Sequence, residues 1–313
     1  MSHSAIHPKT PFLRLDIGLM KVAVRSCEPQ FTTDLAELYD HVRKPDISEE
    51  QLDLQNMLVL QAEPSPTRNP FIKRFKVTGD GQDLFIHLKK NEVLPYLEWA
   101  TNWRVIARYS QFMQIHAASL SYKGNGLILA ATSGSGKSTL AAALMSRGWK
   151  YLCDEFALIN RQTHELHAFP KAICIKAGSF PVLDQLELPR WERKHYVKAF
   201  KGRVAYVKPS ALSQSNLEQT HKIRRIVFPR YVAHQEPVLH EMSRSEAAIQ
   251  LAEMSFNRQV VGGDEAMRIL TRVCRDAQCF RLETGDIHRS CEMIEAIMRE
   301  VDTPKQTRQY RAA

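Results

Sequence analysis

The sequence predicts an α/β protein in which a small α+β domain precedes a larger α/β domain. Three observations predict this class. The chain has 313 residues, which suits two domains of ordinary size. Residues 1–110 mix short alternating strands with helical patterns, and apolar strands alternate with helices after them. Between residues 126 and 148 a strand, a glycine-rich loop and a helix follow one another directly, which is typical of α/β folds.

Composition excludes several classes of protein. Hydrophobic residues make up 44% of the chain and charged residues 25%, which excludes a wholly disordered chain or a fibrous rod. The longest aliphatic run, at residues 127–131, is far shorter than the roughly 20 residues that a membrane helix needs. The first residues lack the apolar segment of a signal peptide, so we expect a cytoplasmic protein without a membrane partner.

The six cysteines and the net charge of +9 bear on cofactors and partners. No two cysteines form a C-x-x-C pair, so we expect reduced, mostly buried thiols and no metal site built on them. The positive charge suits nucleic acid, an acidic membrane face or a phosphorylated ligand. It gathers at residues 190–208, where aromatic residues interleave with Lys and Arg, a mixture that can also stack nucleic-acid bases.

Residues 1–110 are predicted to form the small α+β domain. Alternation at 13–24 predicts a strand or hairpin, and short strands are expected at 57–61, 73–77 and 83–88. Gly79-Asp80-Gly81 predicts a turn that joins the last two strands into a hairpin. Thr33-Asp34 opens a helical pattern that runs to Val42, which predicts a short capped helix.

A second helix is predicted over residues 92–109. Its apolar residues recur at three-residue steps, and we expect one buried face formed by Leu94, Leu97, Ala100 and Trp103. We place the domain boundary at the end of this helix, near residue 110.

Residues 111–300 are predicted to form the larger domain, and the polar residues 301–313 a frayed tail. Strand structure is expected at 113–122, 126–131 and 149–153. A helix made largely of good helix formers is expected to begin near Lys137 and to end at Gly148, a natural C-terminal cap.

The loop before this helix is the most informative stretch of the chain. It follows the phosphate-loop pattern G-x-x-x-x-G-K-[ST], with alanine in the first position. Gly134 and Gly136 allow backbone conformations closed to other residues, so that successive N–H groups can surround an anion. Lys137 can reach the β- and γ-phosphates of a nucleotide, and the Ser138 hydroxyl can bind Mg²⁺. The predicted nucleotide-binding residues are Ala131, Thr132, Ser133, Gly134, Ser135, Gly136, Lys137, Ser138 and Thr139.

Asp154 and Glu155 close the next apolar strand. An acid in this position is the usual second element of a phosphate site, where it holds Mg²⁺ directly or through water. Only sixteen residues separate Lys137 from Asp154, which leaves room for one helix, one turn and one strand and predicts a compact subtype. His116 lies beside apolar residues in an earlier strand, and the residues alone allow either a structural or a catalytic role.

Together these segments resemble the catalytic domain of HPr kinase/phosphorylase, through IHAASL, SGSGKST and LMSRGWKYLCDE. The family has a strand histidine, a phosphate loop, a helix ending in Arg-Gly and a strand ending in two acids, in this order. The sequence is still more similar to the HPr-kinase-related kinase A family, through YLEWATNWRV, CDEFALI, FPKAICIKAGS, KGRVAYVKP, IVFPRY and LAEMSFN. The similarity extends from about residue 93 to residue 290.

The resemblance implies a phosphoenolpyruvate-carboxykinase-like nucleotide fold with a P-loop. It implies a kinase that uses ATP and Mg²⁺ to transfer the γ-phosphoryl group to a hydroxyl, expected to be that of a serine. Relatives are often encoded beside a PqqD-type peptide chaperone, so the expected acceptor is a peptide or small protein. HPr kinases also assemble into oligomers, which leaves a homo-oligomer open for this chain.

The resemblance also assigns candidate roles. The catalytic candidates are Asp154, His116, Lys137 and Glu155, and the candidate metal ligands are Ser138 and Asp154. Asp154 can orient or deprotonate the acceptor or hold the metal, and the sequence leaves these roles open. Four basic residues are candidates to neutralise phosphate charge, with solvated surface charge as the alternative: Lys176, Lys201, Arg203 and Arg230.

Two departures from the bifunctional family shape the prediction. Asp154-Glu155 stands where that enzyme has two aspartates, and FPKAICIKAGS lacks the glycine-rich segment tied to phosphate removal. We therefore predict a kinase without phosphorylase activity. The alternatives are a small-molecule kinase, an ATPase switch that transfers phosphate to water, and a nucleic-acid-binding module. The last is the least favoured because no known nucleic-acid motif is present.

Overall fold

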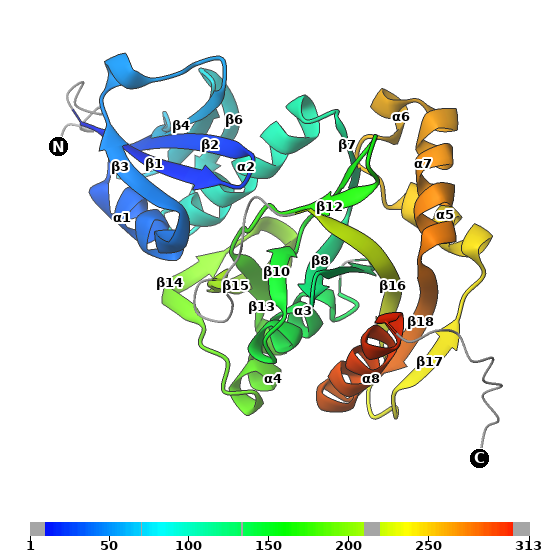
Figure 1. Cartoon of the computed structure of the whole chain (residues 1–313). Coiled ribbons are helices and arrows are strands. Elements are labelled where there is room, and N and C mark those ends of the chain that lie inside the picture. The colour runs from blue at the N-terminus through cyan, green and yellow to red at the C-terminus, as the bar shows by residue number, and fades with distance from the viewer. Residues whose placement is uncertain (1–9, 70, 133, 210–219, 303–313) are drawn as a thin grey trace.

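The structure is a computed structural model that describes residues 10–69, 71–132, 134–209 and 220–302. These residues form a mixed α/β protein with sheets of six, nine and three strands. Figure 1 shows the six-stranded sheet with its two helices on one side of the molecule and the nine-stranded sheet on the other. The three-stranded sheet packs between them, as the contacts below show.

The six-stranded sheet belongs to the N-terminal part of the chain. Its strand order is β3-β1-β2-β4-β5-β6, with β2 and β4 parallel and the other neighbours antiparallel. Its strands are β1 (Phe12–Ile17), β2 (Met20–Ser26), β3 (Arg43–Ile47), β4 (Met57–Pro64), β5 (Phe75–Gly79) and β6 (Gln82–Leu88). The predicted β5–β6 hairpin is confirmed, and of the strand or hairpin expected at 13–24 the structure has the hairpin, β1–β2. The turn between β5 and β6 has positive φ at Asp80 (49°) and Gly81 (80°), as a tight hairpin requires.

Both predicted N-terminal helices exist, but two details of the prediction are wrong. α1 (Pro29–Leu38) begins before Thr33-Asp34, because Pro29 at its start supplies a φ that suits the first helical turn. A short 3-10 turn, η1 (Asp40–Val42), follows it. In α2 (Val93–Arg108), Trp103 is 42% exposed, whereas Leu94, Leu97 and Ala100 are buried. Steps of three residues fall short of the 3.6-residue turn, so three such steps move a side chain to the opposite face.

The nine-stranded sheet is built around three parallel strands. β9 (Asn125–Ala130) pairs with β16 (His221–Tyr231), and β16 pairs with β18 (Gln278–Thr284). Their carboxyl ends therefore meet at one edge of the sheet, the edge at which open α/β sheets bind ligands. The other strands are β7 (Phe112–Ile115), β8 (Ala117–Tyr122), β10 (Lys150–Cys153), β11 (Ala157–Asn160), β12 (Glu165–His167) and β17 (Val238–Glu241). The predicted strand at 113–122 is thus two strands, separated at His116.

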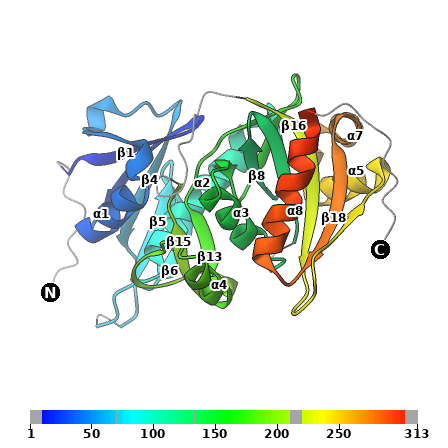
Figure 2. The same ribbon diagram turned by 60° about the horizontal axis from the view of Figure 1, so that its bottom comes forward.

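Helices cover both faces of this sheet (Figure 2). One hydrophobic cluster joins the sheet to α5 (Arg244–Glu253) and α7 (Gly263–Asp276), with the short α6 (Arg258–Val261) beside them. A second cluster joins the opposite face to α3 (Lys137–Ser146) and α8 (Ile287–Arg299). The chain leaves α3 as predicted, through Gly148 at φ +87°. No helix in the described ranges has both the length and the apolar character to cross a bilayer.

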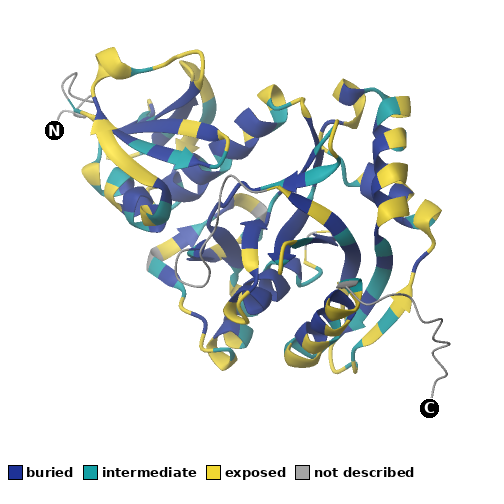
Figure 3. Cartoon of the chain, viewed as in Figure 1, coloured by how far each residue is buried: buried dark blue, intermediate teal, exposed yellow. Residues whose placement is uncertain are grey.

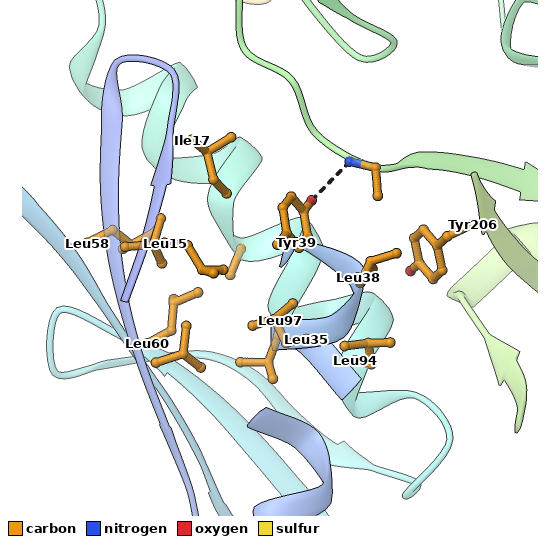
Figure 4. Close-up of a cluster of buried hydrophobic side chains, with 14 of the residues drawn as sticks. Leu15, Ile17, Leu35, Leu38, Tyr39, Leu58, Leu60, Leu94, Leu97 and Tyr206 are labelled. Atoms are coloured by element: carbon orange, nitrogen blue, oxygen red, sulfur yellow. Dashed lines mark hydrogen bonds between the residues drawn. The ribbon is translucent and has the colours of Figure 1, made fainter. Parts of the chain in front are cut away.

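The three-stranded sheet connects the two larger ones. It contains β13 (Ile173–Lys176), β14 (Trp191–Val197) and β15 (Arg203–Val207), with the 3-10 turns η3 (Ala177–Ser179) and η4 (Ala199–Lys201) and the helix α4 (Phe180–Gln185). Tyr206 of β15 reaches the apolar cluster of the N-terminal helices, beside Leu38 (Figure 4). The hydroxyl of Tyr39 in turn accepts a hydrogen bond from the Ala172 N–H at 3.3 Å.

Buried residues follow the strands and the inner faces of the helices (Figure 3). All six cysteines are free thiols, and five are fully buried, as predicted. The predicted boundary near residue 110 stays a prediction, because α2 contacts β4, β5 and β6 on one side and β14 on the other. Residues 303–313 of the predicted tail lie outside the described residues, and Glu300–Asp302 form a 3-10 turn.

The β1–β2 turn provides a test of how the N-terminal sheet packs on the rest. Gly18 has φ +56°, and a Cβ there would lie 2.6 Å from the carbonyl oxygen of Ala168. Gly124 also has positive φ, +82°, but a Cβ there meets nothing within 4 Å. We expect Gly18→Ala to lower the free energy of unfolding by about 1–3 kcal/mol more than Gly124→Ala. Urea unfolding measures both, and equal losses would contradict the close approach.

Candidate functional site

The glycine-rich loop connects β9 to α3 at the carboxyl edge of the parallel strands. Gly134 and Gly136 have φ of +95° and +87°, a region that favours glycine, so the predicted need for glycine is confirmed. Gly136 forms the N-terminal cap of α3, and no side chain caps the helix. The N–H groups of the first turn therefore remain for a ligand, and the helix dipole favours an anion there. Ser133 of the predicted set lies outside the described residues.

Lys137, the first residue of α3, is 7% exposed, and its Nζ has no hydrogen-bond partner among the described residues. Burial lowers the pKa of this ammonium, although Asp154 and Glu155 act in the opposite direction. A buried, unpaired ammonium is costly, and an anion beside it would remove the cost. The side chain is therefore arranged as a phosphate ligand would require.

Ser138 connects the loop to the first predicted acid. Its Oγ donates a hydrogen bond to Asp154 Oδ2 at 2.8 Å, which connects α3 to the residue that follows β10. Asp154 is 5% exposed, and its Oδ1 has no partner among the described residues. Burial raises the pKa of Asp154, and Glu155 raises it further, while Lys137 opposes both. Ser138 and Asp154 thus present a hydroxyl oxygen and a carboxylate oxygen without a hydrogen-bond partner among the described residues. Both oxygens are hard metal ligands.

A cavity of about 760 Å³ opens at this edge of the sheet. The loop residues Thr132, Gly134, Ser135, Gly136, Lys137, Ser138 and Thr139 line it, as do His116 and Glu155. Asp154 does not line it. Asp154 faces a much smaller hollow of about 10 Å³ behind it, and Glu155 borders both. Both predicted acids therefore border the small hollow, but only Glu155 also lines the large cavity, which their adjacency in sequence does not predict.

Of the two predicted acids, Glu155 is the one that lines the cavity. Burial alone would raise its pKa, but Lys201, Lys198, Lys171 and Lys137 outweigh burial and hold the pKa at about 2. Glu155 is therefore ionised throughout the physiological pH range.

His116 lies between β7 and β8 and lines the same cavity. Its backbone N–H donates to the Met254 carbonyl at 2.8 Å, and its ring lies 5.5 Å from that of Phe256. Burial, reinforced by the charge of Lys137, lowers the pKa of the imidazole to about 4. At neutral pH the ring is uncharged and can donate and accept one hydrogen bond each.

The structure separates the four basic candidates into two pairs. Lys176 and Lys201 line the cavity. Arg203 is exposed and pairs with Glu192 at 2.9 Å, and Arg230 is exposed and pairs with Glu283 at 3.3 Å. Neither arginine belongs to the cavity wall. Ala131, the remaining loop residue, is buried at the end of β9 and is not part of the wall either.

Lys201 is held in place by a buried ion cluster that sequence patterns did not predict. Lys198 is 3% exposed and contacts Glu98 of α2 at 3.4 Å. Lys171, 2% exposed, contacts the other oxygen of Glu98 at 2.7 Å and also bonds to Asn102. The turn after Lys198 is strained, with φ +38° at Ala199, and it carries Lys201 to the cavity. Glu98 thus connects α2 to the cavity wall.

The cavity extends beyond the predicted residues to the ends of β16 and β18. Tyr231 lines it, and so does the turn at residues 284–288, which includes Asp286 and His288. Tyr231 ends the segment IVFPRY that carries the resemblance but is not among the predicted site residues, and residues 284–288 belong to no recognised motif. Only the parallel pairing of β9, β16 and β18 brings them to the phosphate loop, and that pairing is not evident from the sequence.

The residues present fit Mg²⁺. The described residues contain no group of three or more His, Cys, Asp or Glu side chains that could hold a metal by themselves. Mg²⁺ usually takes only one or two carboxylates and completes its shell with water and substrate phosphates. The Ser138 hydroxyl and the unpartnered Asp154 Oδ1 offer such a donor set.

Comparisons with known proteins give limited similarities. The family model for the SynChlorMet cassette protein ScmC matches residues 89–179, from α2 through the loop and the two acids. No curated protein matches the chain. Among solved structures, the Hpr(Ser) kinase/phosphatase from Coxiella burnetii is similar at 12% identity, over 60% of this chain and 94% of that chain, with a TM-score of 0.28. We draw no conclusion about fold or activity from a TM-score this low. Membership of the HPr-kinase-related kinase A family stays a prediction.

The ion cluster predicts a large effect of a small substitution. Glu98→Gln keeps the shape of the side chain but leaves Lys171 and Lys198 without their counter-charge, so we expect the free energy of unfolding at pH 7 to fall by about 3–5 kcal/mol. Glu253→Gln, at an exposed position, is the control and should change it little. Chemical unfolding measures both.

The same cluster predicts a pH dependence. The two lysines lower the pKa of Glu98 against the effect of burial. A lowered carboxyl pKa stabilises the fold above the ordinary value near 4.3, and this contribution is lost as the pH falls towards the folded value. The difference in stability between the native chain and Glu98→Gln should therefore shrink below about pH 4. A constant difference would show that the ion cluster does not carry the effect.

Proposed function

We propose that this protein is an ATP- and Mg²⁺-dependent kinase that transfers the γ-phosphoryl group to a hydroxyl, that of a serine in a peptide or small protein. The observation that carries the proposal is Lys137, a buried ammonium without a partner at the start of an uncapped helix. It borders a cavity within the size range of small-molecule sites. The cavity also contains Glu155 and the Ser138 hydroxyl that bonds to Asp154.

The loop and its helix would hold the triphosphate. Backbone N–H groups around Gly134 and Gly136 surround the phosphates, and Lys137 neutralises the β- and γ-phosphate charge. Ser138 and Asp154 would hold Mg²⁺, which supplies further neutralisation of the transferring group. Lys176 and Lys201, which both border the cavity, add positive charge near the phosphates.

Asp154 and Glu155 would have different roles in the transfer. Asp154 bonds to the Ser138 hydroxyl and does not line the cavity, so its place favours metal binding beside Ser138 over contact with the acceptor. Glu155 faces the cavity and is ionised, so it can accept a hydrogen bond from the acceptor hydroxyl and orient it. A pKa of about 2 makes it a weak base, but phosphoryl transfer depends mainly on positioning and charge stabilisation. Neutral His116 can bond to the phosphoryl oxygen or to the acceptor.

The serine acceptor rests on the resemblance to HPr-kinase-related kinases. The same resemblance supports a peptide associated with a PqqD-type chaperone as the acceptor. It also supports the absence of phosphorylase activity, since FPKAICIKAGS lacks the corresponding glycine-rich segment.

Transfer of the γ-phosphate tests the kinase. Radiolabelled Mg-ATP is added to a lysate of the source cell with the native chain, Lys137→Ala, Asp154→Asn or the exposed control Lys73→Ala. We expect a labelled protein band with the native chain and the control, and a loss on the order of 100-fold in the other two variants. Labelled free phosphate alone would identify an ATPase switch, and label in a metabolite would identify a small-molecule kinase.

The phosphorylated acceptor tests the direction of the reaction. Incubated with the native chain and inorganic phosphate, it should keep its label, because the chain lacks the segment tied to phosphate removal. Loss of label that depends on inorganic phosphate and disappears with Lys137→Ala would contradict this prediction.

A further inference from the structure

The two ends of the cavity differ in chemistry. One end, the charged end, has Glu155 and Lys201 in its wall. The other end lies where β16 and β18 finish, with Tyr231 and the turn at residues 284–288 in the wall. The phosphate loop lies between them. A triphosphate needs only the charged end and the loop, so the proposed nucleotide leaves the second end for its nucleoside.

Tyr231 is the aromatic residue at this second end. It is 58% exposed, and a Cβ on Gly136 would lie 3.8 Å from the Tyr231 Cβ. The side chain therefore stands directly beside the first turn of α3, at the edge of the cavity. An exposed aromatic side chain next to an anion site provides a face on which a base can stack.

Asp286 provides the polar counterpart. Its Oδ1 accepts a hydrogen bond from the Arg289 N–H at 3.0 Å and caps α8. Its second carboxylate oxygen accepts no hydrogen bond within the described residues, and the residue lines the cavity. An ionised carboxylate only accepts hydrogen bonds, so it suits hydroxyl donors such as those of a ribose.

We propose that the nucleoside of the bound nucleotide lies at the α8 end of the cavity, with its base against Tyr231 and its ribose hydroxyls on Asp286. This proposal rests on the proposed function, and it fixes the direction of the nucleotide. The γ-phosphate then points to Glu155 and His116, and the acceptor enters at that end. The ligand class is a ribonucleoside triphosphate.

Calorimetric binding of Mg-ATP and of Mg-tripolyphosphate separates the nucleoside from the phosphates. The native chain should bind ATP at least tenfold more tightly than tripolyphosphate. Tyr231→Ala should weaken ATP binding about tenfold and leave tripolyphosphate binding unchanged, and Tyr231→Phe should keep both affinities within twofold. Phe71→Ala, which removes an aromatic side chain that is 93% exposed outside the cavity, is the matched control and should change neither.

Binding of ATP and of an analogue without ribose hydroxyls tests the contact between Asp286 and the ribose. The native chain should bind 2′,3′-dideoxy-ATP more weakly than ATP by about fivefold. In Asp286→Asn the helix cap is retained, because asparagine caps as well as aspartate, but the charge is lost. The preference for ATP over the dideoxy analogue should therefore fall to within twofold.

The outcomes distinguish the two proposals. If the native chain binds neither ATP nor tripolyphosphate, the proposed function is wrong and this inference falls with it. If both ligands bind with equal affinity, or Tyr231→Ala weakens them equally, the nucleoside lies elsewhere and the inference alone is overturned. An unchanged preference for ATP over the dideoxy analogue in Asp286→Asn would overturn the ribose contact.

Discussion

Mutual neutralisation of buried charges is the constraint on which the rest of the structure depends. Lys137, Lys171 and Lys198 are all at least nine-tenths buried, and so are Asp154 and Glu98. Any one of these charges alone would be strongly unfavourable in the interior. Together with Glu155 they form a set of three lysines and three acids that reaches from α2 to the phosphate loop. Lys137 is the one lysine of this set without a hydrogen-bond partner among the described residues, so an anionic ligand would complete the arrangement at that position.

Local sequence was sufficient to predict the strand–loop–helix unit. Glycines at positive φ, a lysine at the first helical position and an acid after the next strand are each demanded by backbone geometry or by charge, and the structure has the strand, the loop and the helix where they were expected. A hydrogen bond joins Ser138 and Asp154, the two predicted metal ligands. The N-terminal hairpins were also predictable, since alternation and turn glycines are local features.

Features that depend on distant contacts were not predictable. Trp103 was assigned to the wrong face because a three-residue repeat drifts around the helix. Asp154 and Glu155 are neighbours in sequence and share the small hollow, yet only Glu155 also lines the large cavity. Glu98, Lys171 and Lys198 meet only after three separate elements have packed. Tyr231 and Asp286 join the cavity only through the parallel pairing of their strands. Arg203 and Arg230 seemed as suitable as Lys201, but surface partners hold them outside the wall.

The strained turn at Ala199 has a consequence for the evolution of the molecule. Lys201 at its end lines the cavity, and Lys198 before it contacts Glu98, which belongs to the helix that also packs on the six-stranded sheet. The N-terminal region is therefore part of the architecture of the phosphate site, even though none of its described side chains lines the cavity. A shorter chain that lacked α2 would keep the glycine-rich loop but lose the anchor of a cavity wall. Gene duplication or fusion that transplanted the loop alone would not transplant the site.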